Sequence, residues 1–178
     1  MRVLHYSDHN DPDLIKLYEN CDVMFATGDL TVFDFLGVTG KPMFGVYGNH
    51  CSGSYFETVG ITNVHLKVLD FEGLRIGGFE GCTRYKEGGG PQFTQEEAKQ
   101  LLVNFPSVDI FLSHSPPFGL LDDPTDPVHV GFQAIRDYID RNHPKYVFCG
   151  HLDPNSELDY QGSKIYRTHG ARMIEIAH

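Results

Sequence analysis

Short apolar runs alternate with amphipathic stretches along the chain, and most apolar runs end in a loop of polar residues. Residues 12–20 carry Leu14, Leu17 and Tyr18 at helical spacing, which predicts a crossover helix. An alternation of strands and helices is typical of an α/β architecture. In the first third of the chain, buried strands are predicted over residues 3–6, 23–26 and 43–47.

The rest of the chain continues this pattern. Residues 68–79 predict a hairpin, and a capping box at residues 94–97 opens a predicted helix that ends at about residue 105. Residues 132–142 predict another amphipathic helix. No linker, repeat or low-complexity block interrupts the pattern, so we expect one domain over residues 1–178. Further strands are predicted over residues 108–112, 146–149, 164–168 and 172–176.

Five polar loops follow predicted strands and carry the side chains that could do chemistry. Ligands of open α/β sheets bind beyond the carboxyl ends of the strands, so we expect these loops to converge on one site. Their mixture of oxygen and nitrogen donors suits two divalent cations, and Asp29 is the obvious carboxylate to bridge them. The candidate donors are Asp8, Asn10, Asp29, Asn49, His50, His114, His151 and Asp153.

Composition narrows the classes of partner. The formal net charge is −10 and no run of Lys or Arg residues occurs, so the chain would repel a long nucleic acid. We expect a small phosphorylated substrate instead, although bound cations would reverse the local charge. No apolar run reaches the roughly 18 residues that predict a membrane span, and we expect a cytoplasmic protein. The sequence leaves open whether the protein forms a homo-oligomer.

The loop motifs occur in a definite order: Asp8-x-Asn10, Gly28-Asp29, Gly48-Asn49-His50, Ser113-His114 and Gly150-His151-x-Asp153. Each motif is weak alone, but five in order at strand ends are hard to obtain by chance. Together they resemble the calcineurin-like metallophosphoesterase superfamily, and residues 77–85, 114–117 and 129–132 resemble its small, single-domain bacterial and archaeal members. The resemblance implies a four-layer αββα sandwich of two mixed sheets flanked by helices, with the active site at the carboxyl ends of the strands.

The resemblance also implies roles for these residues. Asp8 would bind the first metal, and Asp29 would bridge both metals. His50 resembles the general acid, which protonates the leaving group while a metal-bridging hydroxide attacks phosphorus. Arg84 and Asn49 are candidates for substrate binding, Arg84 as a phosphate clamp. The implied ligands of the second metal are Asp29, Asn49, His114 and His151.

The chain departs from the family pattern at two positions of the first-metal site. Asn10 and Asp153 stand where the family usually has histidines. An all-oxygen first site would favour hard cations, so we expect two divalent ions, manganese first, with Mg, Zn, Fe or Ca as alternatives. The first metal would be bound weakly or not at all. Asn10 could equally cap a helix, and Asp153 could equally form an Asx turn.

Two functions of different classes follow from these residues. One is metal-dependent hydrolysis of a phosphomonoester or phosphodiester. The other is a degenerate member of the fold that serves as a protein-binding scaffold, as a retromer subunit does, and the altered first-metal site motivates it. The presence of His50 favours the enzyme, because a scaffold needs no general acid. His129 and His169 are candidates for an outer shell that contacts substrate or holds a loop.

Overall fold

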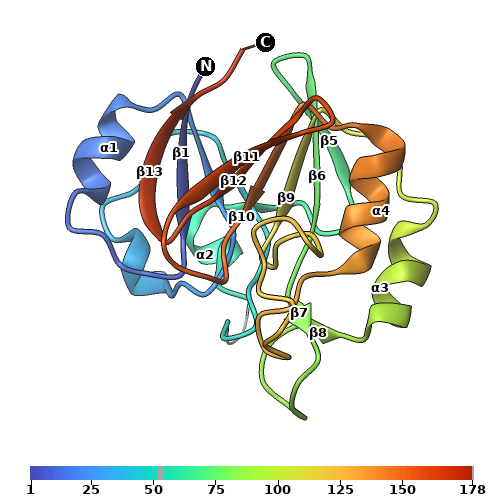
Figure 1. Cartoon of the computed structure of the whole chain (residues 1–178). Coiled ribbons are helices and arrows are strands. Elements are labelled where there is room, and N and C mark those ends of the chain that lie inside the picture. Colours follow the sequence, from blue (N-terminus) through green and yellow to red (C-terminus); the bar gives the residue numbers. More distant parts are fainter. Residues whose placement is uncertain (52–53, 178) are drawn as a thin grey trace.

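Two large mixed β-sheets dominate the computed structural model, which describes residues 1–51 and 54–177 of the chain (Figure 1). In the first sheet the outer strand that ends the chain is antiparallel to its neighbour, and the other neighbours are parallel. The order of strands across this sheet is β13 (Gly170–Glu175), β1 (Arg2–Ser7), β2 (Val23–Ala26), β3 (Met43–Gly45) and β4 (Thr62–Asn63).

The second sheet has parallel strands at its centre and an antiparallel strand at each edge. The order across it is β11 (Ser156–Tyr160), β12 (Ser163–Arg167), β10 (Tyr146–Cys149), β9 (Ile110–Ser113), β6 (Leu74–Phe79) and β5 (Val68–Phe71). A small separate ribbon pairs β7 (Cys82–Thr83) with β8 (Gln92–Phe93).

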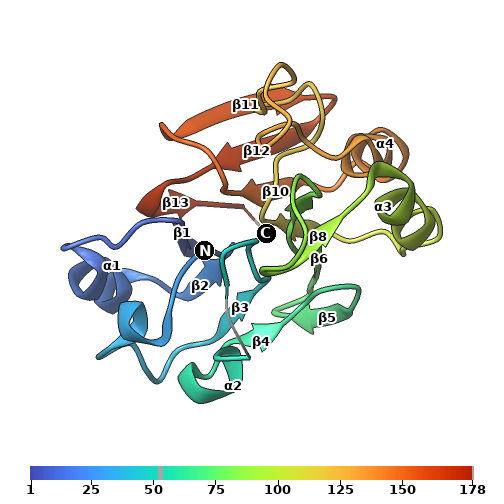
Figure 2. The same ribbon diagram turned by 90° about the horizontal axis from the view of Figure 1, so that it is seen from below.

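Helices cover the outer faces of both sheets (Figure 2). The first sheet carries α1 (Leu14–Asn20), the 3-10 helix η1 (Val32–Phe35) and α2 (Phe56–Val59). The second sheet carries α3 (Gln95–Leu102) and α4 (Gln133–Asn142). Among residues 1–51 and 54–177, no helix has both the length and the apolar character that crossing a membrane requires.

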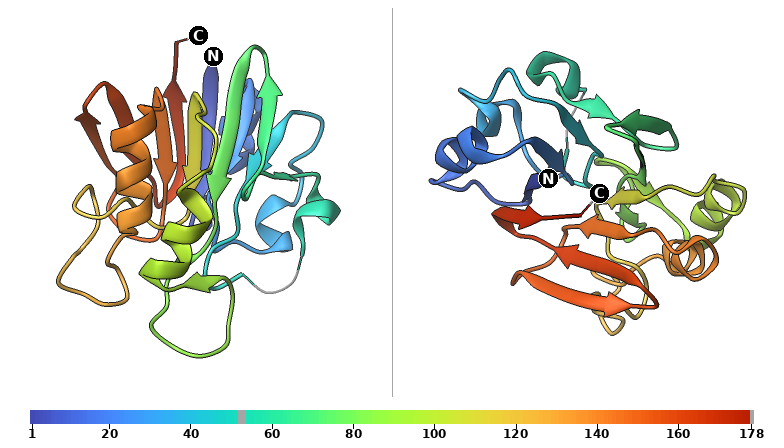
Figure 3. Two further views of the ribbon diagram at one scale, coloured as in Figure 1. Left: turned by 90° about the vertical axis from the view of Figure 1, so that its right-hand side faces the viewer. Right: turned by 90° about the horizontal axis from the view of Figure 1, so that it is seen from above.

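Buried side chains form one core between the sheets and one under each helical layer. Val3 and Phe25 of the first sheet meet Ile76, Ile110 and Phe148 of the second sheet in the central core. A second cluster joins α3 and α4 to the second sheet, and a third joins α1, η1 and α2 to the first. The expected four-layer arrangement of helices and two mixed sheets is therefore confirmed (Figure 3).

Most expected elements are present, with shifted ends. The capping box forms as expected: Thr94 accepts a hydrogen bond from the Glu97 backbone, and Glu97 bonds back to the Thr94 backbone. The helix that follows ends at Leu102, before the expected residue 105, because the residue before Pro106 disfavours helical dihedrals. Strand β11 was not expected, since its alternating exposed side chains leave a weak apolar pattern.

Candidate metal centre

The loops after β1, β2 and β10 turn sharply where each strand ends. Asp8, Asp29 and His151 all adopt left-handed backbone conformations, with φ of 65°, 54° and 72°. Such non-glycine residues cost about 1–3 kcal/mol each and concentrate at functional sites. Gly28 has φ of +100°, and a Cβ there would lie 2.3 Å from the Gly48 nitrogen, so only glycine lets these loops approach so closely.

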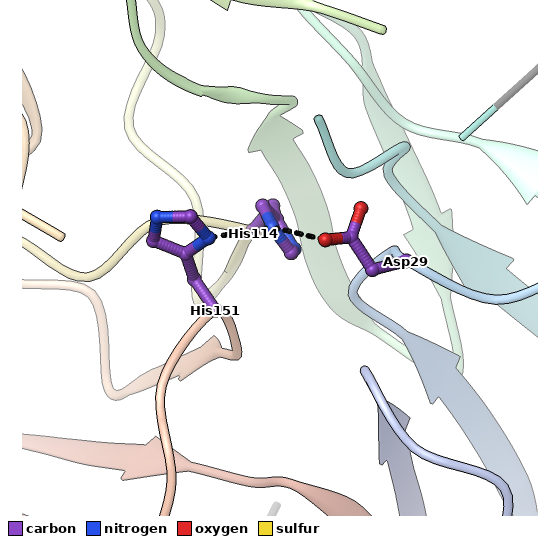
Figure 4. A group of neighbouring side chains, drawn as sticks. All are labelled: Asp29, His114 and His151. Carbon is purple, nitrogen blue, oxygen red and sulfur yellow. Dashed lines mark hydrogen bonds and ion pairs between the residues drawn. The ribbon is translucent and has the colours of Figure 1, made fainter. Parts of the chain in front are cut away.

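His114, which follows β9, stands at the centre of a group of side chains from four loops. Figure 4 shows its ring between Asp29 and His151. Its Nε2 lies 3.3 Å from Asp29 Oδ2, 2.9 Å from Asn49 Oδ1 and 3.0 Å from His151 Nδ1. One ligand atom from each of Asp29, His114 and His151 lies within 4.8 Å of the others. The structure therefore brings together the full set of side chains expected to bind the second metal.

Backbone carbonyls set the tautomers of both histidines. The Nδ1 of His114 lies 2.7 Å from the carbonyl oxygen of Thr27, and the Nε2 of His151 lies 2.8 Å from that of Val128. A carbonyl only accepts, so each of these ring nitrogens carries a proton. The opposite nitrogens, which face each other, are left with lone pairs in the neutral rings. A carbonyl partner of this kind is typical of histidines that bind metals.

These atoms could hold a cation. Nε2 of His114 faces another ring nitrogen and two acceptor oxygens, and a single proton on it can serve only one of the three. Ligands of a tetrahedral zinc ion lie about 2.0–2.2 Å from the metal, which places them about 3.3 Å from one another. The distances from His114 Nε2 to Asn49 Oδ1 and Asp29 Oδ2, 2.9 and 3.3 Å, are close to this spacing, and the donor atoms of Asp29, His114 and His151 all lie within 4.8 Å of one another. The donor set therefore suits a divalent metal.

The carboxylates of the site favour a positive charge at its centre. Burial opposes a charge on the His114 ring, but the carboxylates of Asp29 and Asp8 outweigh burial and raise the pKa of His114 to about 9. Burial alone would raise the pKa of Asp29, yet His114 lowers it to about 2. Burial, aided by the charge of His114, lowers the pKa of His151 to about 3. A proton on His114 thus takes the place that a metal would fill.

A cavity of about 650 Å³ opens beside this centre. Asp8 lies in its wall, where Oδ2 accepts hydrogen bonds from Ser7 Oγ at 2.5 Å and from the His151 backbone at 2.8 Å. Burial raises the pKa of Asp8. A cation bound there would offset the cost of burying this carboxylate charge. The residues that line the cavity are Asp8, Asp29, His50, Val128, His129, His151, Leu152, Asp153 and His169.

Of the residues expected only at the first-metal site, two line the cavity and one does not. Asp153 lines the cavity together with Asp8 and Asp29. The amide of Asn10 instead donates a hydrogen bond to Asp34 Oδ1 at 3.3 Å, and Asn10 is not among the cavity-lining residues described. Helix α1 has Asp13 at its N-cap, so Asn10 does not cap it either. Three carboxylates thus face the cavity where the first metal was expected.

His50 is exposed and lines the cavity, so a molecule bound there can reach its ring. Its backbone N–H donates to Asp29 Oδ1 at 2.7 Å, which ties its position to the expected bridging carboxylate. The next residue along the chain is Cys51, whose sulfur accepts hydrogen bonds from the backbones of Asp29 and Gly48, at 3.3 and 3.2 Å. This buried thiol fastens the two loops to each other.

The two expected substrate-binding residues lie in different surroundings. The guanidinium of Arg84 pairs with Glu97 at 2.8 Å and donates to the Gln92 carbonyl, and Arg84 is not among the cavity-lining residues described. The amide of Asn49 donates to the Tyr85 hydroxyl at 3.4 Å, which leaves Oδ1 facing His114. Asn49 therefore stands at the metal centre, and Arg84 stands outside the cavity.

Several partners of the site were not found by sequence reasoning. The carbonyls of Thr27 and Val128 carry no signal in the sequence, because every residue has one. Asp126, which holds His129 at 2.5 Å between Oδ2 and Nδ1, was also missed. The two histidines named as outer-shell candidates, His129 and His169, both line the cavity.

Comparisons with known proteins identify the family and the fold. The family model for calcineurin-like phosphoesterases matches residues 1–153. No curated protein is similar enough in sequence to count as a match. One crystal structure aligns over 99% of both chains with a TM-score of 0.71 and 14% sequence identity.

Two further crystal structures share the fold at low sequence identity. The phosphopantetheinyl hydrolase PptH from Mycobacterium tuberculosis aligns over 97% of this chain and 95% of its own, with a TM-score of 0.64 and 12% identity. The protein TT1561 of Thermus thermophilus aligns over 93% and 88%, with a TM-score of 0.61 and 15% identity. Because the family model covers most of its length, the chain belongs to the calcineurin-like phosphoesterase family.

Proposed function

We propose that the protein is a metal-dependent phosphoesterase that hydrolyses a small phosphomonoester or phosphodiester. One observation carries the proposal. Two imidazole nitrogens, each freed by a backbone carbonyl, meet Asp29 and Asn49 around a single point beside an open cavity. Family membership supports the class of chemistry.

The residues at this point divide into two donor sets that share Asp29. Asn49, His114 and His151 would complete a nitrogen-rich site, which suits a transition metal such as manganese or zinc. Asp8 and Asp153 would complete a harder, oxygen-only site. When bound, divalent ions would neutralise charge on the phosphoryl group and activate the attacking water.

His50 is the group we assign to proton donation. Its exposed ring lines the cavity, and its backbone is held by the same Asp29 carboxylate that faces His114. A general acid must lie within hydrogen-bond reach of the leaving oxygen, and a residue on the cavity wall can meet a bound ester there. The assignment makes His50 a catalytic residue and Asp29 the carboxylate that positions it.

The test is hydrolysis by protein stripped of metal with EDTA and titrated with Mn²⁺, Mg²⁺, Ca²⁺ or Zn²⁺ while bound metal is counted. The substrates are p-nitrophenyl phosphate and bis-p-nitrophenyl phosphate, and the preferred one sets the substrate class. We expect turnover that rises with metal and saturates at two ions per chain. Absence of turnover with every metal would contradict the proposal.

A matched pair of histidine variants makes this test specific. His151→Asn removes a metal ligand and should abolish metal-stimulated turnover. His143→Asn changes a histidine at the end of α4, away from the cavity, where φ is 46°, and asparagine tolerates this left-handed conformation. The second variant should keep full activity and metal content, so any loss in the first can be assigned to the site.

One surface feature favours the alternative of a protein-binding scaffold. Phe33 and Leu36 of the η1 region are 75% and 69% exposed, and Ile15 of α1 is 41% exposed. Large exposed apolar groups that form one patch mark interaction surfaces. A scaffold would bind a protein through this region and show no turnover with any metal, so the same assay separates the two functions.

Two further expectations stand as proposals. We infer that residues 1–178 form one domain, because the central core takes side chains from both sheets. We also infer a cytoplasmic location. All four cysteines are buried and unpaired, as expected in a reducing compartment.

A further inference from the structure

His129 and Asp126 form a pair on the wall of the cavity that the proposed chemistry does not use. Nδ1 of His129 lies 2.5 Å from Asp126 Oδ2, and its ring centroid lies 5.1 Å from that of His151. The His129 side chain is 39% exposed and lines the cavity. The pair therefore stands beside the metal centre and remains accessible to a molecule bound there.

The loop between β9 and α4 is built so as to hold this pair in place. Asp126 Oδ1 accepts the backbone N–H of Val128 at 2.9 Å, and the Asp126 carbonyl accepts that of Val130 at 2.8 Å. Thr83 Oγ1, from β7, donates to the Val130 carbonyl at 3.1 Å. The carbonyl of Val128 holds the His151 ring. None of these four bonds involves the His129 ring, so all four can persist when that ring is replaced.

Because Asp126 engages Nδ1, only Nε2 of His129 is left for a molecule in the cavity. A hydrogen bond between Nε2 and a phosphoryl oxygen needs one proton, which either the ring or the phosphoryl group can supply. Hydrogen bonds in which one partner is ionised, as a phosphoryl group is, are among the strong ones. A histidine held by a carboxylate is thus suited to receive a phosphoryl oxygen.

The charge of the cavity wall creates a need for such a donor. Among the described residues that line the cavity, three are carboxylates and none is lysine or arginine. Contacts to an anionic ester can then come from bound metals and from the histidines of the wall. The ring of His129, one of these histidines, is paired with Asp126. Asp126 is not among the donors proposed for the metal centre.

We propose that His129 is a substrate-contacting residue that binds a phosphoryl oxygen through Nε2, and that Asp126 is the positioning residue that orients it. The inference deepens the proposed function and rests on it. It assigns recognition of the phosphoryl group to the loop between β9 and α4.

The test is the affinity of metal-loaded protein for inorganic phosphate, measured by calorimetry for the natural chain and three variants. His129→Ala removes the contact. His129→Asn keeps a donor in the place of Nδ1, which faces Asp126, and His129→Gln keeps one in the place of Nε2, which faces the cavity. We expect phosphate affinity to fall about tenfold in the Ala and Asn variants and to recover in part in the Gln variant. His143→Asn is the control, and metal content should be equal in all.

Each outcome decides between a binding role and a structural one. Unchanged phosphate affinity in His129→Ala, no phosphate binding by the natural chain, or recovery by Asn as complete as by Gln would overturn the inference. In turnover of p-nitrophenyl phosphate, the Ala variant should raise KM more than it lowers kcat, because a contact made before and during reaction acts on binding.

Failure of the inference is distinguishable from failure of the proposed function. Turnover by the natural chain with unaltered phosphate affinity in His129→Ala would remove the inference and keep the function. Weakened phosphate affinity in the variant, with no turnover by the natural chain, would keep the contact and remove the hydrolysis.

Discussion

Removal of metal should make the stability of this protein fall as the pH rises above neutrality. In the metal-free protein, the charge that holds Asp29, Asp8 and His114 together is a proton on His114. Burial opposes that charge, but the two carboxylates outweigh burial and raise the pKa of His114 to about 9, from an ordinary value of 6.5. The folded chain therefore keeps a proton that the unfolded chain releases.

The sign and size of the effect follow from this difference. Between the two pKa values the folded state binds more protons than the unfolded state, so the free energy of unfolding falls with rising pH. The stabilisation is complete below about pH 6.5, amounts to about 3 kcal/mol, and is lost as the pH passes through about 9. Between about pH 6 and about pH 8.5, a loss of about 2 kcal/mol is expected.

His151 acts at lower pH and with the opposite sign. Burial, aided by the charge of His114, lowers its pKa to about 3. The unfolded chain then takes up a proton as the pH falls below 6.5, and the folded chain does not do so until the pH approaches about 3. Stability is lost as the pH falls through that range, so measurements above pH 6.5 report mainly on His114.

The assay is urea denaturation of EDTA-treated protein at a series of pH values in this window. The same protein saturated with Mn²⁺ is the control, because a bound metal replaces the proton and should flatten the dependence. Asp29→Asn removes a carboxylate that raises the His114 pKa and should also flatten it. Equal slopes with and without metal, or a stability that rises with pH in the metal-free protein, would refute the reasoning.

Three other predictions concern single side chains. His50→Ala should lower kcat by about 100-fold or more with unchanged metal content, and unaltered turnover would remove His50 from the mechanism. His151→Ala should weaken metal binding by more than the about 10–100-fold typical of outer-shell changes, measured by competition with a chelator. Tyr138→Phe should lower the free energy of unfolding by about 1–3 kcal/mol in urea, because the buried Val108 N–H loses its acceptor at 3.1 Å; no change would show that the group finds another partner.

The sequence determined which residues could form the site because their positions follow from strand ends. Asp29 and Asn49 come after strands of the first sheet, and His114 and His151 come after strands of the second. Each pair follows neighbouring parallel strands, whose carboxyl ends share an edge of their sheet. The hairpin at Glu72 and the capping box at Thr94 were also predictable, since short local patterns carry them.

Local sequence patterns could not predict the edge strand β11 or the contacts that place Asn10. Strand β11 alternates half-buried and exposed side chains, and it pairs along its whole length with β12, which lies next to it in the sheet. Asn10 and Asp153 were equivalent by sequence, yet the fold turns Asn10 toward Asp34 and leaves Asp153 in the cavity wall. Asn10 lies away from the cavity because Asp34 of η1 accepts its hydrogen bond, and a contact between these two distant segments has no local sequence signal.

The pairing of the two histidines with carbonyls was decided by tertiary structure alone. Thr27 and Val128 act through their backbone carbonyls, which every residue possesses. Their residue types therefore do not indicate that they bind the histidine rings. Their placement fixes which ring nitrogens face each other and thereby directs two lone pairs toward the place where a cation could bind. The sequence supplied the donor chemistry, and long-range packing supplied the direction of each lone pair, because direction depends on contacts between segments up to 87 residues apart along the chain.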